Sequence, residues 1–98
     1  DQIDYELLRE IACQVQVPLV QHGTCGISLQ DLTKLGKSGM SKINFGEPFR
    51  FSYIKYFNEL TDNMEHLWHP WKIMQQIKEK LKADMKELII ALGSNGKA

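Results

Sequence analysis

Apolar residues recur along this chain at two spacings, which predict four helices and two short strands. Residues three and four apart share one face of a helix, and apolar side chains follow this rule in four segments, 5–15, 29–35, 49–60 and 70–92. Two strand candidates separate the first three of these segments: the short apolar run Val17–Val20 and the segment Met40–Phe45. The predicted order is therefore helix, strand, helix, strand, helix, helix.

Residues with capping chemistry mark the expected helix ends. Asp4 precedes the first helix, and Ser28 begins the second with chemistry like that of a capping box. Pro70 stands at the first position of the last helix, where the missing N–H of proline costs least. Glycines are expected to stop two helices, the second at Gly36 and Gly39 and the last at Gly93.

The alternation of strands and helices indicates βα units and a parallel sheet. The run Val17–Val20 is apolar throughout, which is typical of a parallel strand buried on both faces. Two such strands are not a stable sheet alone, because each exposes an unpaired edge and two apolar faces. A closed eight-stranded barrel needs roughly 250 residues, and this chain has 98. We therefore expect residues 1–98 to be part of one larger α/β domain.

The overall composition argues against nucleic acid and membranes as partners of this chain. Twelve basic and twelve acidic side chains give a formal net charge of zero, so the chain has no long-range attraction for nucleic acid or for an anionic membrane. No run of eighteen apolar residues predicts a membrane span. Two cysteines, Cys13 and Cys25, are too few for a disulfide scaffold, and we expect a reduced, cytoplasmic protein.

Polar residues and glycines gather after each predicted strand. His22-Gly23-Thr24-Cys25-Gly26 follows the strand Pro18–Gln21, and Asn44-Phe45-Gly46-Glu47 follows the strand Met40–Ile43. In parallel α/β sheets, ligands bind beyond the carboxyl ends of the strands. Glycines let backbone N–H groups approach an anion, and His22 is placed to bind a metal or to polarise a carbonyl. These two segments form the candidate site.

Each of these segments also has a structural interpretation. His22 can be a surface residue, the glycine pair can be ordinary turn chemistry, and Asn44 can bond its own backbone at a strand end. Cys25 lies near a helix N-terminus and is either a nucleophile or a replacement for serine. His66 and His69 have the spacing of a metal pair on a helical turn, but no third ligand accompanies them. The occurrence of two such polar segments after successive strands is the observation that favours a binding pocket.

Three segments resemble the class II, zinc-dependent ketose-bisphosphate aldolases. The segment from Val17 to Ile27 is similar to their VPLVLHGGSGI sequence, and Gly39–Asn44 is similar to their GI-KIN strand. The ending Leu92–Ala98 is similar to the GSAGKA tail of the fructose- and tagatose-bisphosphate branch. The resemblance implies that this chain is the C-terminal quarter of a (β/α)₈ TIM barrel, with the last two βα units and C-terminal helices. Two parallel strands and mostly helical content are then expected.

The resemblance also implies roles for particular residues. It nominates His22 as a ligand of Zn²⁺. For the substrate and its phosphate it nominates Gly23, Thr24, Cys25, Asn44, Gly46 and Glu47. The family's other zinc ligands and its proton-transferring aspartate lie on earlier strands, so no catalytic acid or base is expected on this segment, and the isolated piece should be inactive.

The implied reaction is reversible aldol cleavage of a ketose (bis)phosphate to dihydroxyacetone phosphate and an aldehyde, with zinc as the Lewis acid. A phosphorylated sugar is the expected partner, and a homo-oligomer is the expected assembly.

Two departures from the family pattern leave the substrate open. Thr24-Cys25 stands where Gly-Ser is usual, and a thiol is a weak hydrogen-bond donor. Gly46-Glu47-Pro48 replaces Asp-Thr-Asp, and a glutamate repels a phosphate dianion if its side chain faces it. The alternative function is therefore a degenerate barrel that binds a sugar phosphate without catalysis. An unrelated helical interaction module is a third possibility, favoured only by the long last helix.

Overall fold

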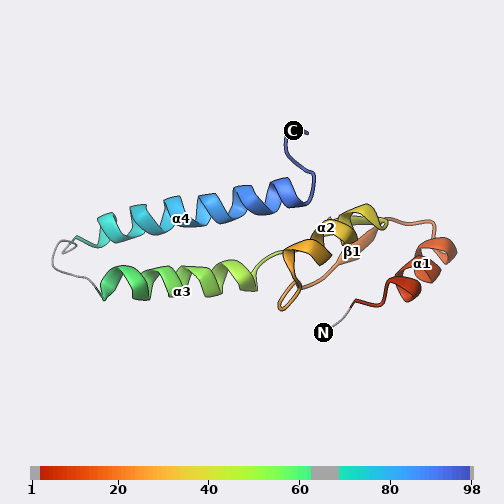
Figure 1. Ribbon diagram of the computed structural model, residues 1–98, viewed down its shortest axis with the longest axis horizontal. Helices are drawn as coiled ribbons and strands as arrows, with labels where there is room; N and C mark the ends of the chain where they lie inside the picture. Colours follow the sequence, from red (N-terminus) through yellow and green to blue (C-terminus); the bar gives the residue numbers. More distant parts are fainter. Residues whose placement is uncertain (1–2, 63–68, 98) are drawn as a thin grey trace.

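The computed structural model describes residues 3–62 and 69–97. The elements follow the predicted order, as helices α1 (Tyr5–Gln14), α2 (Leu29–Lys37), α3 (Glu47–Thr61) and α4 (Pro70–Ala91) and strands β1 (Leu19–Gln21) and β2 (Met40–Ile43). Figure 1 shows α3 and α4 side by side as a long hairpin that projects away from the two strands, with α1 at the opposite end. His66 of the considered metal pair lies outside the described residues.

The predicted caps hold the helix ends. An oxygen of the Asp4 carboxylate accepts a hydrogen bond from the Leu7 N–H at 3.0 Å, and the Ser28 hydroxyl accepts one from the Asp31 N–H at 3.1 Å. Each bond satisfies a backbone donor that the first turn of a helix leaves without a partner. Pro70 opens α4, and Gly93 follows its end with a φ of +72°, a conformation that favours glycine.

Two sequence boundaries were wrong by a few residues. Val17 and Pro18 precede β1 and lie outside it; the proline nitrogen carries no hydrogen to donate to a neighbouring strand. Gly36 lies inside α2, which ends at Lys37, and Gly39 makes the turn into β2 with a φ of +94°. The turn therefore needs only the second glycine of the pair.

The strands pair in parallel, as predicted. Leu19 is opposite Met40, Val20 is opposite Lys42 and Gln21 is opposite Ile43, with an irregularity between Leu19 and Val20. Helix α2 connects the two strands and packs on β2, which gives one complete βαβ unit. Their carboxyl ends therefore emerge at the same edge of the sheet.

The apolar core is small and lies around α2. Leu8, Leu32 and Leu35 are buried together, and Leu88 of α4 and Leu92 just after it pack against them. Ile73 and Ile77 are buried on α4, which packs along α3. Among the described residues, no helix is long and apolar enough to cross a membrane.

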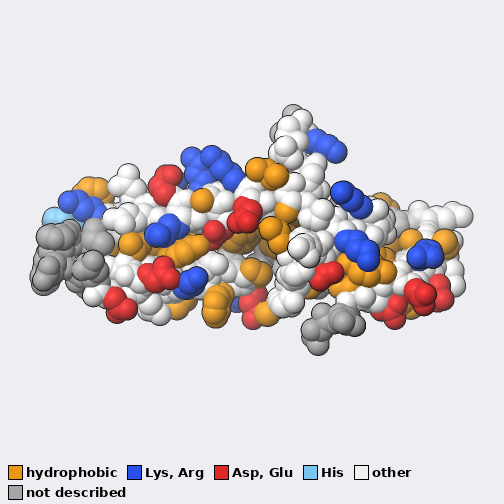
Figure 2. All heavy atoms as spheres, viewed as in Figure 1, with side chains coloured by type: hydrophobic (Ala, Val, Ile, Leu, Met, Phe, Trp, Pro, Cys, Tyr) orange, Lys and Arg blue, Asp and Glu red, His pale blue; other side chains and the backbone are white. Residues whose placement is uncertain are grey.

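Much of the apolar surface expected to be buried is open in this chain. Val17 is 66% exposed and Val20 is 43% exposed, although the sequence predicts a strand covered on both faces. Phe51 and Ile54 on α3 are also exposed, and Figure 2 shows apolar side chains along the hairpin and around the sheet. The open faces of β1 are what further strands and helices of a larger barrel would cover. The mostly helical content with two parallel strands agrees with part of a TIM barrel.

Candidate functional site

The two predicted site segments meet at the carboxyl edge of the sheet. His22 follows β1 directly and Asn44 follows β2 directly. The backbone N–H of Asn44 donates to the carbonyl of Gln21 at 3.0 Å, which extends the strand pairing by one residue. The side chains then lie together, with Nδ2 of Asn44 3.4 Å from Nδ1 of His22. The two candidate side chains therefore lie next to each other, and His22 is exposed at the surface of this chain.

The contact with Asn44 can orient the imidazole. If the amide oxygen of Asn44 faces Nδ1, the ring carries its proton there and leaves Nε2 with a lone pair for a metal. If the amide nitrogen faces Nδ1, the ring carries its proton on Nε2 instead. His22 is exposed, so its side chain is accessible to groups outside this chain.

The glycine loop after His22 forms a tight turn with open space above it. The N–H of Ile27 donates to the carbonyl of Thr24 at 3.1 Å, and Gly26 has a φ of +75°, as the third residue of a type II turn requires. Gly23 also has a positive φ, +74°. A Cβ added at Gly23 or at Gly26 would meet no atom within 4 Å, so a ligand has room to approach the backbone there.

Gln21 fixes the start of this loop. Its side-chain amide nitrogen donates to the carbonyl of His22 at 3.2 Å and to the carbonyl of Gly23 at 3.1 Å. One side chain therefore fixes two successive peptide units of the loop, both of which belong to the candidate site. The sequence analysis missed this residue. The signal was available, because a polar residue stands here where the VPLVLHGGSGI segment has leucine.

Thr24 and Cys25 lie in opposite environments although they are adjacent. Thr24 is buried, with 4% of its surface exposed, whereas the Cys25 thiol is free and exposed at the tip of the turn. A serine at the tip would present its hydroxyl to the same open side. The exposure of Cys25 is compatible with the expected replacement of serine.

The second loop places an acidic side chain at the start of α3. Gly46 is the N-cap of this helix and offers no side-chain bond, and Glu47 is its first residue. Both residues are exposed. A carboxylate is favourable in the first turn because the helix dipole is positive there. The same charge opposes an anion bound at this helix end.

A catalytic zinc ion takes three protein ligands and keeps one position open. Among residues 3–62 and 69–97, no group of three histidine, cysteine, aspartate or glutamate side chains lies close enough to hold a metal. His22 has the donor, exposure and position of one such ligand, so the chain fits a zinc site to which it contributes a single imidazole. A zinc site built on His22 would take its remaining ligands from outside the described residues.

The comparison with known proteins agrees with the geometry. The family model for class II fructose-bisphosphate aldolase matches residues 1–97. The chain belongs to the class II fructose-bisphosphate aldolase family. The fructose-bisphosphate aldolases of Staphylococcus epidermidis and Staphylococcus aureus are 27% and 26% identical to it over 96 residues, or 98% of its length.

Membership of the class II aldolase family explains the incomplete sheet. The chain spans 34% of the length of the curated relatives that it matches, which agrees with the expectation of a partial barrel. The open faces of β1 have the same origin, because the relatives that the chain matches are longer.

Proposed function

We propose that the full-length protein containing this chain catalyses reversible, zinc-dependent aldol cleavage of a ketose (bis)phosphate to dihydroxyacetone phosphate and an aldehyde. Family membership supports the reaction class. The observation that carries the assignment to this site is the 3.4 Å contact between His22 and Asn44 at the carboxyl edge of the strands. The balanced charge and free cysteines favour a cytoplasmic enzyme.

The residues of this chain would bind and orient the substrate. Bound zinc would supply Lewis-acid chemistry at the ketone oxygen. His22 would provide one zinc ligand, and the Asn44 amide would hydrogen-bond to the substrate beside it. Backbone N–H groups of the loop 23–26 would face the substrate phosphate, which the open space at Gly23 and Gly26 permits. The proton transfer would belong to residues outside this chain.

A second candidate function follows from Glu47. The carboxylate stands where the family pattern has a phosphate-binding threonine, and like charges close together repel strongly at low dielectric. A protein that binds a sugar phosphate without cleaving it would tolerate this substitution. The two functions differ in turnover, and zinc occupancy alone does not separate them.

The test combines metal analysis and an aldol cleavage assay on the full-length protein and two variants. His22→Ala should lower both zinc content and activity by at least about a hundredfold, since changes in the outer shell of a metal site alone cost about 10–100-fold. His69→Ala is the matched control, because His69 is also exposed but caps α4 without a side-chain bond.

Three results decide between the candidates. Loss of zinc and activity in His22→Ala alone supports the aldolase. Full zinc occupancy without turnover on any ketose phosphate supports the non-catalytic binder. Unchanged zinc content in His22→Ala removes this residue from the ligand set and overturns the proposal.

A further inference from the structure

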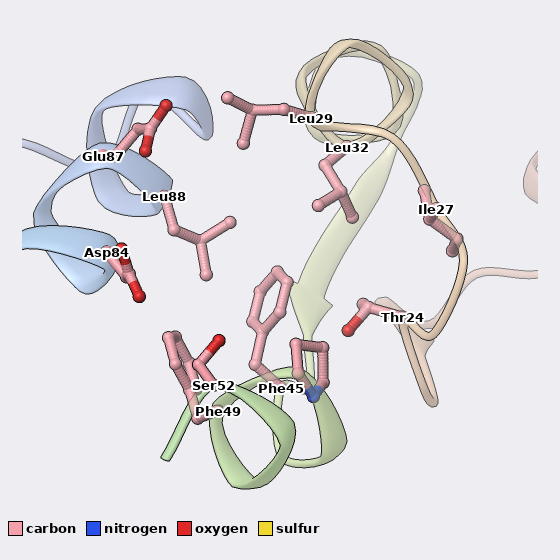
Figure 3. Close-up of a pocket in the computed structure, with 11 residues that line it drawn as sticks. Thr24, Ile27, Leu29, Leu32, Phe45, Phe49, Ser52, Asp84, Glu87 and Leu88 are labelled. Carbon is pink, nitrogen blue, oxygen red and sulfur yellow. The ribbon is translucent and has the colours of Figure 1, made fainter. Parts of the chain in front are cut away.

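A cavity lies between the glycine loop and the helical hairpin formed by α3 and α4. It has a volume of about 340 Å³, near the lower end of the range of small-molecule sites. Figure 3 shows side chains from the loop, from α2, from the end of β2 and from both hairpin helices around it. Within this chain, the lining brings together residues from the glycine loop, α2, the segment after β2, α3 and α4.

One polar group at this cavity has no partner. The Thr24 hydroxyl is buried and forms no hydrogen bond with any described residue, and in Figure 3 its oxygen points into the cavity. A buried hydroxyl without a partner costs about 1–3 kcal/mol, so such groups in folded proteins call for an explanation. A bound molecule that reaches Thr24 would satisfy it.

The opposite wall is acidic. Asp84 and Glu87 are three residues apart on α4 and therefore share one face of the helix. The Tyr56 hydroxyl donates to one oxygen of Asp84 at 2.5 Å, and the second oxygen of this carboxylate remains as an acceptor. Among the described residues that line the cavity, none is basic. The wall therefore disfavours phosphate and attracts a cation.

The floor between these two walls is apolar and aromatic. Ile27, Leu32 and Leu88 contribute aliphatic surface. The rings of Phe45 and Phe49 lie 6.4 Å apart between centroids, at an angle of 56°. Aromatic faces attract organic cations in addition to burying apolar atoms. The cavity thus combines a cation-binding end, an apolar middle and a hydroxyl end.

We propose that this cavity binds a small organic ammonium compound that has an apolar body and a hydroxyl group at its far end. The ammonium group pairs with Asp84 and Glu87, the body packs on Phe45 and Leu88, and the hydroxyl group bonds to Thr24. Because Thr24 belongs to the loop that begins at His22, occupancy also steadies that loop. The cavity shares Thr24 with the loop that is proposed to bind phosphate, but its test measures binding and does not depend on turnover.

The probe is tyramine, titrated by calorimetry into the full-length protein, with two matched compounds. Phenethylamine lacks only the hydroxyl group, and 4-hydroxyphenylethanol replaces the ammonium group with a neutral one. We expect tyramine to bind about fivefold more tightly than phenethylamine, the gain of one neutral hydrogen bond. It should bind about tenfold more tightly than 4-hydroxyphenylethanol because of the paired charge.

Variants assign each difference to a residue. Thr24→Val keeps the shape of the side chain and should bring tyramine down to the affinity of phenethylamine. Glu87→Gln should reduce the preference for the ammonium compounds severalfold, and Asp84→Asn should do the same while keeping an acceptor for Tyr56. Glu79→Gln is the control, because this exposed carboxylate lies on the same helix but does not line the cavity.

The results that would overturn the proposal are specific. Absence of tyramine binding to the folded full-length protein means that only water occupies the cavity. Equal affinities for the three compounds, or an unchanged preference in both Thr24→Val and Glu87→Gln, place the binding elsewhere. Loss of aldolase turnover without loss of tyramine binding affects the proposed function and leaves this site standing.

Discussion

At the scale of single residues, the glycine loop depends on a side chain that its motif does not include. Gln21 bonds to the carbonyls of His22 and Gly23 from the last position of β1. Strand alternation places Gln21 on the opposite face from Val20, but alternation alone does not say that the side chain folds back along the backbone. The bonds restrict the backbone of a loop that would otherwise owe its conformation to glycine, the residue with the most freedom.

Gln21→Leu in the full-length protein should loosen this loop. Each lost bond contributes about 0.5–1.5 kcal/mol, with the lower end expected at an exposed site. Amide hydrogen exchange over residues 22–26 should become severalfold faster, and KM for the phosphorylated substrate should rise more than kcat falls. Gln30→Leu is the control, because Gln30 is exposed on α2 and leucine and glutamine have similar helix propensities. Equal exchange in the loop of both variants would show that the two bonds do not hold it.

At the scale of elements, two tyrosines of α3 hydrogen-bond to α4, Tyr53 to the sulfur of Met74 and Tyr56 to a carboxylate. Tyr56 on α3 donates to Asp84 on α4, and Nζ of Lys80 lies 5.3 Å from the centroid of the Tyr56 ring. The hydrogen bond to Asp84, followed by partial desolvation and the charges of Asp84, Glu59 and Glu87, raises the pKa of Tyr56 to about 12. The contact is made by the protonated phenol.

This pKa predicts how stability depends on alkaline pH. An unfolded tyrosine has a pKa of about 10, so the stability from the Tyr56–Asp84 contact is fully present below pH 10. It is lost as the pH rises from about 10 to 12, where the unfolded state releases the proton first. The difference in melting temperature between the full-length protein and Tyr56→Phe should therefore be constant below pH 10 and vanish towards pH 12.

Tyr5 provides the internal reference for that experiment. Partial desolvation and a hydrogen bond to Asp31 also raise the pKa of Tyr5, and its contribution is the same in both proteins. A difference that persists unchanged through pH 12 would mean that the Tyr56–Asp84 contact does not contribute to stability.

The helices and strands were predictable from sequence where residues close together in the chain determine them. The caps at Asp4 and Ser28, the apolar stripe of α4 and the parallel pairing all follow from spacing and from the alternation of strands and helices. Pro18 was assigned to a strand because the run around it is apolar. Its ring has no N–H to donate, and the pairing begins one residue later, at Leu19.

The details of the candidate site depend on contacts between segments distant in sequence. The meeting of His22 and Asn44 was expected from strand topology, whereas the cavity between Thr24 and Asp84 was not. These residues are 60 positions apart, and only the packing of α4 beside α2 brings their segments to one cavity. The spacing of apolar residues along the chain does not predict that Thr24 and Asp84 line the same cavity.

At the scale of the whole molecule, the chain is too extended for its length. The radius of gyration is 17.3 Å, compared with about 13 Å for a compact protein of 100 residues. Its dimensions are 58 × 31 × 19 Å, and large apolar side chains such as Val17, Phe51 and Ile90 are exposed. Patches of this kind on a separate chain lead to association.

The isolated 98-residue chain should therefore be weakly stable or associate with itself. Sedimentation velocity should show species larger than a monomer, with a distribution that shifts with concentration. Heating should give a broad transition because the described residues share so small a core. A monodisperse monomer with a sharp, cooperative thermal transition would contradict this expectation and would indicate a self-sufficient fold.

The two-stranded sheet has a practical consequence for producing the full-length protein. Within the described chain each strand has a single neighbour, so each keeps one row of backbone donors and acceptors that an incoming strand can pair. Such open edges suit reconstitution from two separately expressed polypeptides, of which this chain is one and the preceding barrel segment is the other. Co-expression should keep both parts soluble. Recovery of the proposed aldol cleavage would show that their strand edges have paired.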